Sequence, residues 1–488
     1  MLFNSFPFVI FFAVVTSVYF LLPHKFRWLL LLIASCYFYM FFKPVYILIL
    51  GFTIVIDYYA GILLENEKDL KRRKKFLIMS LIANIGVLAV FKYFNFLNAN
   101  ITGLGELMGF KNHIPYLNIL LPIGLSFHTF QAMSYTIEVY RGHQKAERHF
   151  GIYSLYVMFY PQLVAGPIER PQNMLHQFHE KKYFNYNDAV TGMRLMIWGL
   201  FKKAVIADRL ALVTDPVFNN PHAYSSLSIL IACIFFSFEI YCDFSGYSDM
   251  ALGSARVMGF KLMKNFDRPY SARKISEFWR RWHISLSTWF KDYLYIPLGG
   301  NKVSTGRKYY NLFVVFLISG LWHGADWKFI IWGALHGFFQ VFGSITEHTR
   351  NQFNKLIGLT RIPWLYSIVQ RGITFLLVTL AWVFFRAENT KVALYMIGRV
   401  PAAFGELAAM LKTKVSAINI PISTGKLVLC FLVIIVMELV HRIQKKRSFN
   451  TLLQNQPRPV RWAVYYAFVF TIMYLGVFYN RQFIYFQF

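Results

Sequence analysis

Long apolar runs alternate with short polar segments along nearly the whole chain. A run of about 20 apolar residues is long enough to cross the hydrocarbon core of a bilayer as a helix. These runs are therefore the candidates for membrane segments. The runs cover residues 7–22, 28–42, 45–64, 76–91, 119–140, 150–168, 189–207, 227–241, 311–322, 329–342, 372–385, 427–440 and 460–479.

The run 150–168 is interrupted by Pro161, Gly166 and Pro167. Broken apolar segments of this kind often line a cavity instead of facing lipid. We expect about eleven or twelve membrane segments, counting the short and re-entrant ones. The predicted fold class is all-α, a polytopic transmembrane helical bundle. Because the chain shows no internal repeat, residues 1–488 are expected to form a single membrane-embedded domain.

The composition agrees with residence in a membrane. Hydrophobic residues make up 56% of the 488 positions and charged residues 15%, whereas a soluble domain carries about a quarter charged residues. The first apolar run has no basic residue ahead of it and no small-residue cleavage site, so it is expected to be retained as a span. The four cysteines are too scattered for a zinc site, and no metal site is predicted.

The net charge of +28 would suit a nucleic-acid-binding protein. The basic residues, however, stand in short clusters between apolar runs, such as 71–75 and 445–447. No soluble basic domain is left to bind nucleic acid. This placement follows the positive-inside rule and suits the anionic headgroups of a lipid bilayer. Basic loops alternate with nearly neutral ones over the first five spans, which predicts an extracytoplasmic N-terminus.

Ionisable residues inside apolar segments are functional candidates, because placing a charge in lipid is unfavourable in free energy. They gather between Glu239 and His336. Glu239 and Asp243 stand four residues apart and would share a helix face. A structural ion pair with a basic side chain explains these carboxylates better than direct catalysis does.

A second polar cluster has the sequence EFWRRWHISLSTWF, which begins at Glu277. Read at helical spacing, it predicts an amphipathic helix at the membrane interface, with tryptophan on the apolar side and arginine on the polar side. That interpretation does not explain His283, which points with the apolar residues. A histidine in such a place is either a satisfied core residue or a catalyst, and the core residue is the commoner case.

His323 stands between two apolar runs, flanked by Gly320 and Gly324. Small neighbours let another group approach the ring closely, and Asp326 could orient the ring if the helix continues through Gly324. Imidazole suits proton transfer near neutral pH. The alternative is a histidine that is hydrogen-bonded between spans, and this interpretation is adopted for His336.

Together these motifs resemble the membrane-bound O-acyltransferase superfamily, most closely its bacterial branch typified by the alginate O-acetylation membrane subunit. The similarity covers essentially the whole chain and implies a bundle of spans around a central tunnel, with a catalytic core at about 150–345. The matching pieces are 243–249, WRRWHISLS and DYLYIPLGG within 278–300, SGLWHG at 319–324, YPQLVAGPIER at 160–170 and FIYFQF at 483–488.

The resemblance implies that two histidines carry the chemistry. His323 matches the family's near-invariant intramembrane histidine and would act as a general base on the acceptor hydroxyl. His283 matches the second histidine of the site and would polarise the donor carbonyl or hold the acceptor. The candidate substrate-binding residues are Trp279, Arg280, Arg281, Trp282, Lys202, Lys203 and Asp326.

The resemblance also implies the substrates. The donor is acetyl-CoA, and no tightly bound cofactor is expected. The acceptor is a cell-surface polysaccharide such as alginate, or a serine of a separate extracytoplasmic SGNH-type acetyltransferase. Lys202, Lys203, Arg280 and Arg281 would contact the CoA phosphates if they lie at an interface, or would only extend to lipid headgroups, which is the commoner arrangement. The chain is expected to be a multi-pass protein of the bacterial cytoplasmic membrane.

Two rival functions stay open at the level of sequence. A transporter or flippase would use buried histidines and carboxylates as a proton relay, and it would leave the acetyl-CoA thioester intact. An acyltransferase of the same superfamily would transfer a long acyl chain to a lipid or protein acceptor. Donors of increasing chain length would separate that enzyme from an acetyltransferase.

Overall fold

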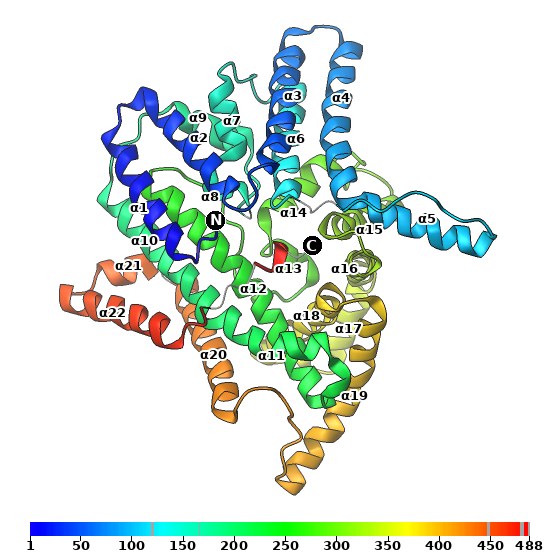
Figure 1. Cartoon of the computed structure of the whole chain (residues 1–488). Coiled ribbons are helices and arrows are strands. Elements are labelled where there is room, and N and C mark those ends of the chain that lie inside the picture. Colours follow the sequence, from blue (N-terminus) through cyan, green and yellow to red (C-terminus); the bar gives the residue numbers. More distant parts are fainter. Residues whose placement is uncertain (119–121, 165, 447–448, 479–482, 487–488) are drawn as a thin grey trace. The chain divides into compact units, whose positions relative to one another are not determined.

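The fold is described from a computed structural model that covers residues 1–118, 122–164, 166–446, 449–478 and 483–486 (Figure 1). Every regular element in these ranges is helical. The chain divides into two compact units, which are Met1–Trp198 with Tyr247–Lys264, and Gly199–Gly246 with Asn265–Phe488. Parts of the predicted segment 119–140, of the motifs at 160–170 and 483–488, and of the basic cluster 445–447 lie outside the described residues.

Unit 1 contains the helices of the N-terminal part of the chain. They are α1 (Phe6–Leu21), α2 (His24–Met40), α3 (Tyr46–Asn66), α4 (Leu70–Leu88), η1 (Ala89–Tyr93), α5 (Phe94–Met108), α6 (Leu125–Arg141), α7 (Phe150–Met158), α8 (Tyr160–Leu163), α9 (Pro171–His179), most of α10 (Tyr186–Leu200) and the end of α12 (Ser226–Val257).

Helices α3, α4 and α6 pack together in unit 1 (Figure 1). Their shared surface contains the buried carboxylate of Asp57, which accepts hydrogen bonds from Ser80 Oγ at 2.6 Å and from Asn84 Nδ2 at 2.9 Å. A buried charge is tolerated only when such partners replace water. These hydrogen bonds therefore fix how α3 and α4 align.

Unit 2 contains the helices of the C-terminal part. They are η2 (Phe201–Ala207), α11 (Asp208–Asn219), η3 (Pro221–Ala223), the first part of α12, η4 (Pro269–Ser271), α13 (Ile275–Trp279), α14 (Ile284–Phe290), η5 (Lys291–Tyr295), α15 (Thr305–His323), α16 (Trp327–Ile345), α17 (Glu347–Leu356), η6 (Leu359–Arg361), α18 (Pro363–Arg386), α19 (Thr390–Thr413), α20 (Thr424–Lys446), α21 (Phe449–Gln454), α22 (Arg458–Leu475) and η7 (Ile484–Phe486).

Six helices of the described chain are long and apolar enough to cross a membrane, or seven if the bent pair α16 and α17 forms one span. We expected about eleven or twelve membrane segments, including short ones. The difference arises because several apolar runs form helices that are too short to be counted alone, since a counted helix has at least 18 residues. Examples are α1 with 16 residues and α2 with 17. Large apolar side chains lie exposed on the long helices, for example Leu48 and Leu376, as lipid contact requires. The chain is a multi-pass membrane protein.

Helices α15 and α16 lie side by side in unit 2 and cross at two glycines (Figure 1). A Cβ atom on Gly320 would lie 3.1 Å from Gly333 Cα. A Cβ atom on Gly324 would meet the ring of Phe329. Small residues allow two helix backbones to approach this closely. The crossing positions the end of α15, where His323 is the last helical residue.

Candidate active site

His283 lies at a break between two short helices. The continuous helix expected across 277–290 is not formed, because α13 ends at Trp279 and α14 begins at Ile284. His283 precedes α14 with a left-handed backbone, φ 43°. A non-glycine residue in such a conformation costs roughly 1–3 kcal/mol and persists only where its surroundings hold it. The ring itself is fully buried.

Two backbone hydrogen bonds hold this break in place. Ile284 N donates to Asn265 O, and Asp267 N donates to Arg281 O, each at 2.9 Å. The segment from Asn265 to Asp267 is therefore tied to both sides of His283. This pairing offsets the strain of the left-handed residue.

The side chain of Asn265 determines which nitrogen of His283 carries the proton. Its Oδ1 atom accepts hydrogen bonds from Ser285 N at 3.2 Å and from Ser285 Oγ at 2.9 Å. Because a backbone N–H can only donate, the atom that faces it must be the amide oxygen. The same oxygen lies 3.1 Å from His283 Nδ1. In the neutral ring Nδ1 is therefore protonated, and Nε2 is a hydrogen-bond acceptor.

His323 lies at the end of α15 among aromatic rings. Its side chain is buried, and its ring centroid is 4.8 Å from that of Trp322, 4.9 Å from that of Trp332 and 5.4 Å from that of Phe385. These rings come from α15, α16 and α18, which pack together in unit 2. The imidazole is thus held in a water-poor environment by three helices.

Asp326 does not continue the helix that carries His323. Helix α15 ends at His323, and Gly324 is extended. The continuous helix that would have brought Asp326 beside the ring is therefore not formed. Instead, the Asp326 carboxylate caps α16 by accepting a hydrogen bond from Lys328 N at 2.9 Å. Asp326 thus begins a helix, as a capping residue does.

Tyr485, in the C-terminal motif, contacts both histidines. Its ring centroid lies 5.7 Å from that of His323 and 6.4 Å from that of His283. The segment is held where Ile484 N donates to Asp243 Oδ2 at 2.8 Å. We call His283, His323 and Tyr485 the histidine enclosure. No role could be predicted for Tyr485, because a tyrosine within an apolar motif carries no signal of its own.

Asp243 belongs to a buried ion-pair cluster. Lys203 Nζ lies 2.6 Å from Asp243 Oδ1 and 2.9 Å from Asp208 Oδ1, so the structural ion pair expected for Asp243 is present. Glu239 instead accepts a hydrogen bond from Thr214 Oγ1. Lys202, the neighbour of Lys203, is also buried and donates to Ser245 Oγ at 2.8 Å. Both side chains are buried among polar groups of α11 and α12 inside unit 2, so they do not extend from the protein to lipid headgroups.

The two predicted tryptophans pack in the interior of unit 2. Trp279 Nε1 donates to His336 Nδ1 at 3.3 Å, which agrees with a packing role for His336. The ring centroid of Trp282 lies 4.9 Å from that of Trp382. Both tryptophans are buried. Trp282, which directly precedes His283 in the chain, and Trp382 form what we call the aromatic layer.

The two arginines predicted to bind substrate differ in their exposure and in their contacts. Arg280 is exposed. Arg281 forms an ion pair with Glu277, with 2.8 Å between Nη2 and Oε1. Arg281 also lines a cavity in unit 2, whereas Lys202 and Lys203 do not line that cavity.

Comparison with known proteins agrees with the composition of this site. Residues 143–380 match the family described as membrane-bound O-acyltransferase, a range that includes both histidines. A "probable alginate O-acetylase" of Pseudomonas aeruginosa is 37% identical over 89% of this chain and 81% of its own length.

Two further relatives are named for other activities. A peptidoglycan O-acetyltransferase of Helicobacter pylori is 38% identical over 75% of this chain and 72% of its own length. A teichoic acid D-alanyltransferase of Streptococcus thermophilus is 30% identical over 49% of this chain and 62% of its own length. The extent of these similarities, together with the helical membrane fold, shows that the chain belongs to the membrane-bound O-acyltransferase family and is an O-acyltransferase.

Proposed function

We propose that this O-acyltransferase moves an acetyl group from cytoplasmic acetyl-CoA across the bacterial cytoplasmic membrane to a hydroxyl acceptor outside. The observation that carries the proposal is the histidine enclosure, in which Tyr485 contacts two buried imidazoles. Coenzyme A carries several phosphates and does not cross lipid. A tunnel that admits the thioester from one face and the acceptor from the other solves this problem.

In the proposed reaction, His323 takes the proton from the acceptor hydroxyl while the hydroxyl oxygen attacks the carbonyl carbon of the thioester. The C–S bond then breaks, the acetyl group stays on the acceptor oxygen, and the proton passes to the leaving thiolate. General-base catalysis of this kind contributes roughly 10²–10⁴-fold. Of the two roles considered for His283, holding the acceptor fits its geometry better. Nε2 of the neutral ring can accept a hydrogen bond from another donor group of the acceptor, while the attacking hydroxyl gives its proton to His323.

The acceptor is proposed to be a cell-surface polysaccharide such as alginate, or a serine of an extracytoplasmic SGNH-type acetyltransferase that completes the transfer. Two relatives are named for O-acetylation of alginate and of peptidoglycan, which supports a polysaccharide as the eventual acceptor. The positive-inside arrangement of the basic loops supports an extracytoplasmic N-terminus.

The test uses the full chain in detergent with acetyl-labelled acetyl-CoA and an acceptor hydroxyl. His323→Ala should reduce label transfer by roughly 10²-fold or more, because the general base is lost. His336→Gln is the matched control, since His336 is also buried but contacts Trp279, and it should retain most activity. Undiminished transfer by His323→Ala would remove that histidine from the mechanism, and an intact thioester in the wild type would favour a transporter.

A further inference from the structure

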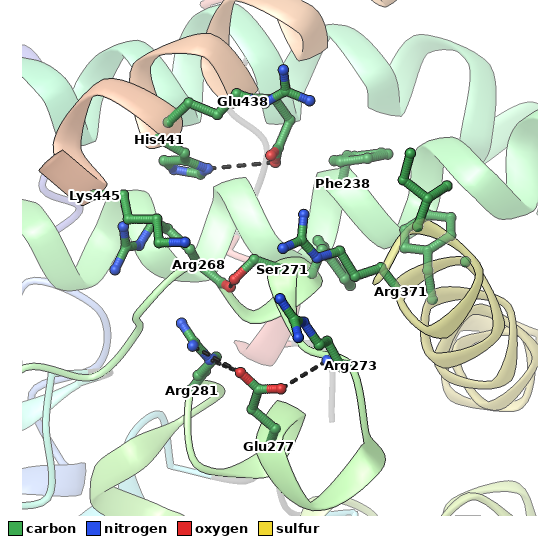
Figure 2. Close-up of a pocket in the computed structure, with 15 residues that line it drawn as sticks. Phe238, Arg268, Ser271, Arg273, Glu277, Arg281, Arg371, Glu438, His441 and Lys445 are labelled. Carbon is green, nitrogen blue, oxygen red and sulfur yellow. Dashed lines mark hydrogen bonds and ion pairs between the residues drawn. The ribbon is translucent and has the colours of Figure 1, made fainter. Parts of the chain in front are cut away.

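A cavity of about 770 Å³ lies in unit 2 between the segment around α13 and the helices α18 and α20 (Figure 2). Pockets for small molecules commonly occupy roughly 300–1,000 Å³, so the space suits a ligand of nucleotide size. Six of its fifteen lining residues are basic. They are Arg268, Arg273, Arg281, Arg371, Arg442 and Lys445.

The acidic side chains of the lining do not balance these charges. Two carboxylates, Glu277 and Glu438, face six basic groups, which leaves an excess of four positive charges. Glu277 Oε2 accepts a hydrogen bond from Arg273 N at 2.8 Å, and Glu438 lies 3.4 Å from His441 Nδ1 (Figure 2). Partial burial acts to raise the pKa of Glu277, but hydrogen bonds from Arg273 N and Arg281 outweigh it and hold the pKa below its usual value.

Two of the arginines also have polar atoms that the described residues leave unsatisfied. Arg268 Nη1 and Arg371 Nε are buried and have no hydrogen-bond acceptor among the described residues. Arg268 has a left-handed backbone, φ 48°, and strained residues of this kind cluster at ligand sites. Guanidinium groups match phosphate oxygens in geometry and charge. The lining therefore suits an anion with several oxygens.

The cavity adjoins the aromatic layer that precedes His283. Tyr270 lines the cavity, and its ring centroid lies 6.3 Å from that of Trp282, the residue before His283. Phe238 and Phe375 add two more rings to the lining. A ligand with phosphates at one end and a less polar body would thus have its phosphates among the arginines and its body against aromatic rings.

We propose that this cavity binds a ligand that carries two or more phosphate groups. Two sources share that chemistry, namely a soluble nucleotide thioester and the headgroup of a lipid with two phosphates, such as cardiolipin. Assigning the ligand to the acyl donor rests on the proposed function. The cavity residues replace Lys202 and Lys203 as the candidates for phosphate contact.

The test measures binding, not transfer. Adenosine 3′,5′-bisphosphate carries phosphates but neither thiol nor acyl group, and its affinity for the full chain in detergent is measured by calorimetry. The double variant Arg371→Gln and Arg442→Gln should weaken binding at least ~10-fold, because charge-assisted hydrogen bonds are lost. The double variant Lys302→Gln and Arg307→Gln removes two exposed charges outside the cavity and should change the affinity less than about twofold.

A second arm identifies the source of the phosphates. The protein is reconstituted in vesicles that contain cardiolipin and extracted, and the retained cardiolipin is counted by mass spectrometry. Bisphosphate binding that the cavity variant loses supports a soluble ligand, whereas retained cardiolipin that only this variant loses supports a lipid. If the cavity variant and the wild type do not differ for either ligand, the proposal is overturned. His323→Ala should bind the bisphosphate normally, so failure of the catalytic proposal can be recognised separately.

Discussion

At the scale of single residues, Asn265 restricts what His283 can do. Its amide oxygen meets Ser285 N, Ser285 Oγ and His283 Nδ1, so the imidazole is held in one tautomer and one orientation. Asn265 is a positioning residue that acts through His283. Outer partners of this kind control catalysis through geometry, because small misplacements of a catalytic group are costly.

Asn265→Leu removes the acceptor of three hydrogen bonds and frees the His283 ring. We expect transfer to fall by roughly 10²-fold, mainly in kcat, as the geometry loosens. Ser285→Ala is the control, because it removes one donor to Asn265 while the contact to His283 stays. Steady-state acetyl transfer for the two variants is the measurement, with nitrogen NMR of labelled histidine reporting the tautomer. Equal activity of both variants would contradict this role.

His323 and Asn265 differ in whether the sequence alone can reveal them. His323 could be found because an ionisable side chain inside an apolar run stands out. Asn265 could not, since it lies 18 residues from His283 and an asparagine in a polar segment is ordinary. The burial of Lys202 and Lys203 could not be predicted either, because Ser245 and Asp243, which pair with them, lie far along the chain on α12.

Among the helices, the crossing of α15 and α16 determines where His323 of the histidine enclosure lies. The two backbones meet at Gly320 and Gly333, and His323 follows one turn after the first glycine. A side chain at the crossing would push the helices apart and move the imidazole. Helix packing and catalytic geometry therefore depend on the same contact.

Gly333→Ala should lower thermal stability, because its Cβ atom would meet Phe316 O and the Gly320 backbone. Overpacking of this kind costs about 1–3 kcal/mol. Gly343→Ala, on the same helix with open space around it, should keep or raise stability, since alanine is the better helix former. A thiol-reactive dye can report the midpoint, because Cys233, Cys242 and Cys430 are buried until unfolding. A melting temperature for Gly333→Ala equal to that of Gly343→Ala would show that the crossing tolerates a methyl group.

The apolar pattern predicts some elements well and misses others. The run 45–64 corresponds to α3, whereas α18 begins nine residues before the run 372–385, since Gln370 and Arg371 interrupt the apolar pattern there. The same pattern could not reveal the break before α14, which depends on backbone pairing with the segment that begins at Asn265. Periodicity reports burial of a face, not the hydrogen bonds that end a helix.

At the scale of the whole molecule, the basic loops and the exposed apolar surface govern insertion into lipid. The loop between α3 and α4 borders the cluster 71–75, while the loop after α5 is nearly neutral. Positive loops stay in the cytoplasm because translocating them is unfavourable. The two loops should therefore lie on opposite sides of the membrane.

Single cysteines in place of Lys68 and Lys111, both exposed, test this orientation in a background without the four native cysteines. An impermeant maleimide should label Lys111→Cys in intact cells. It should label Lys68→Cys only after the membrane is permeabilised. Labelling in the opposite order would reverse the predicted topology and place the N-terminus in the cytoplasm.

The left-handed backbone at position 283 limits which mutants of this histidine are informative. Asparagine adopts such a conformation far more readily than a β-branched residue does. Loss of function in His283→Val would therefore mix rearrangement of the main chain with removal of the imidazole. His283→Asn keeps the local chain path while deleting the ring, so it is the variant by which a saturation library at this position should be calibrated.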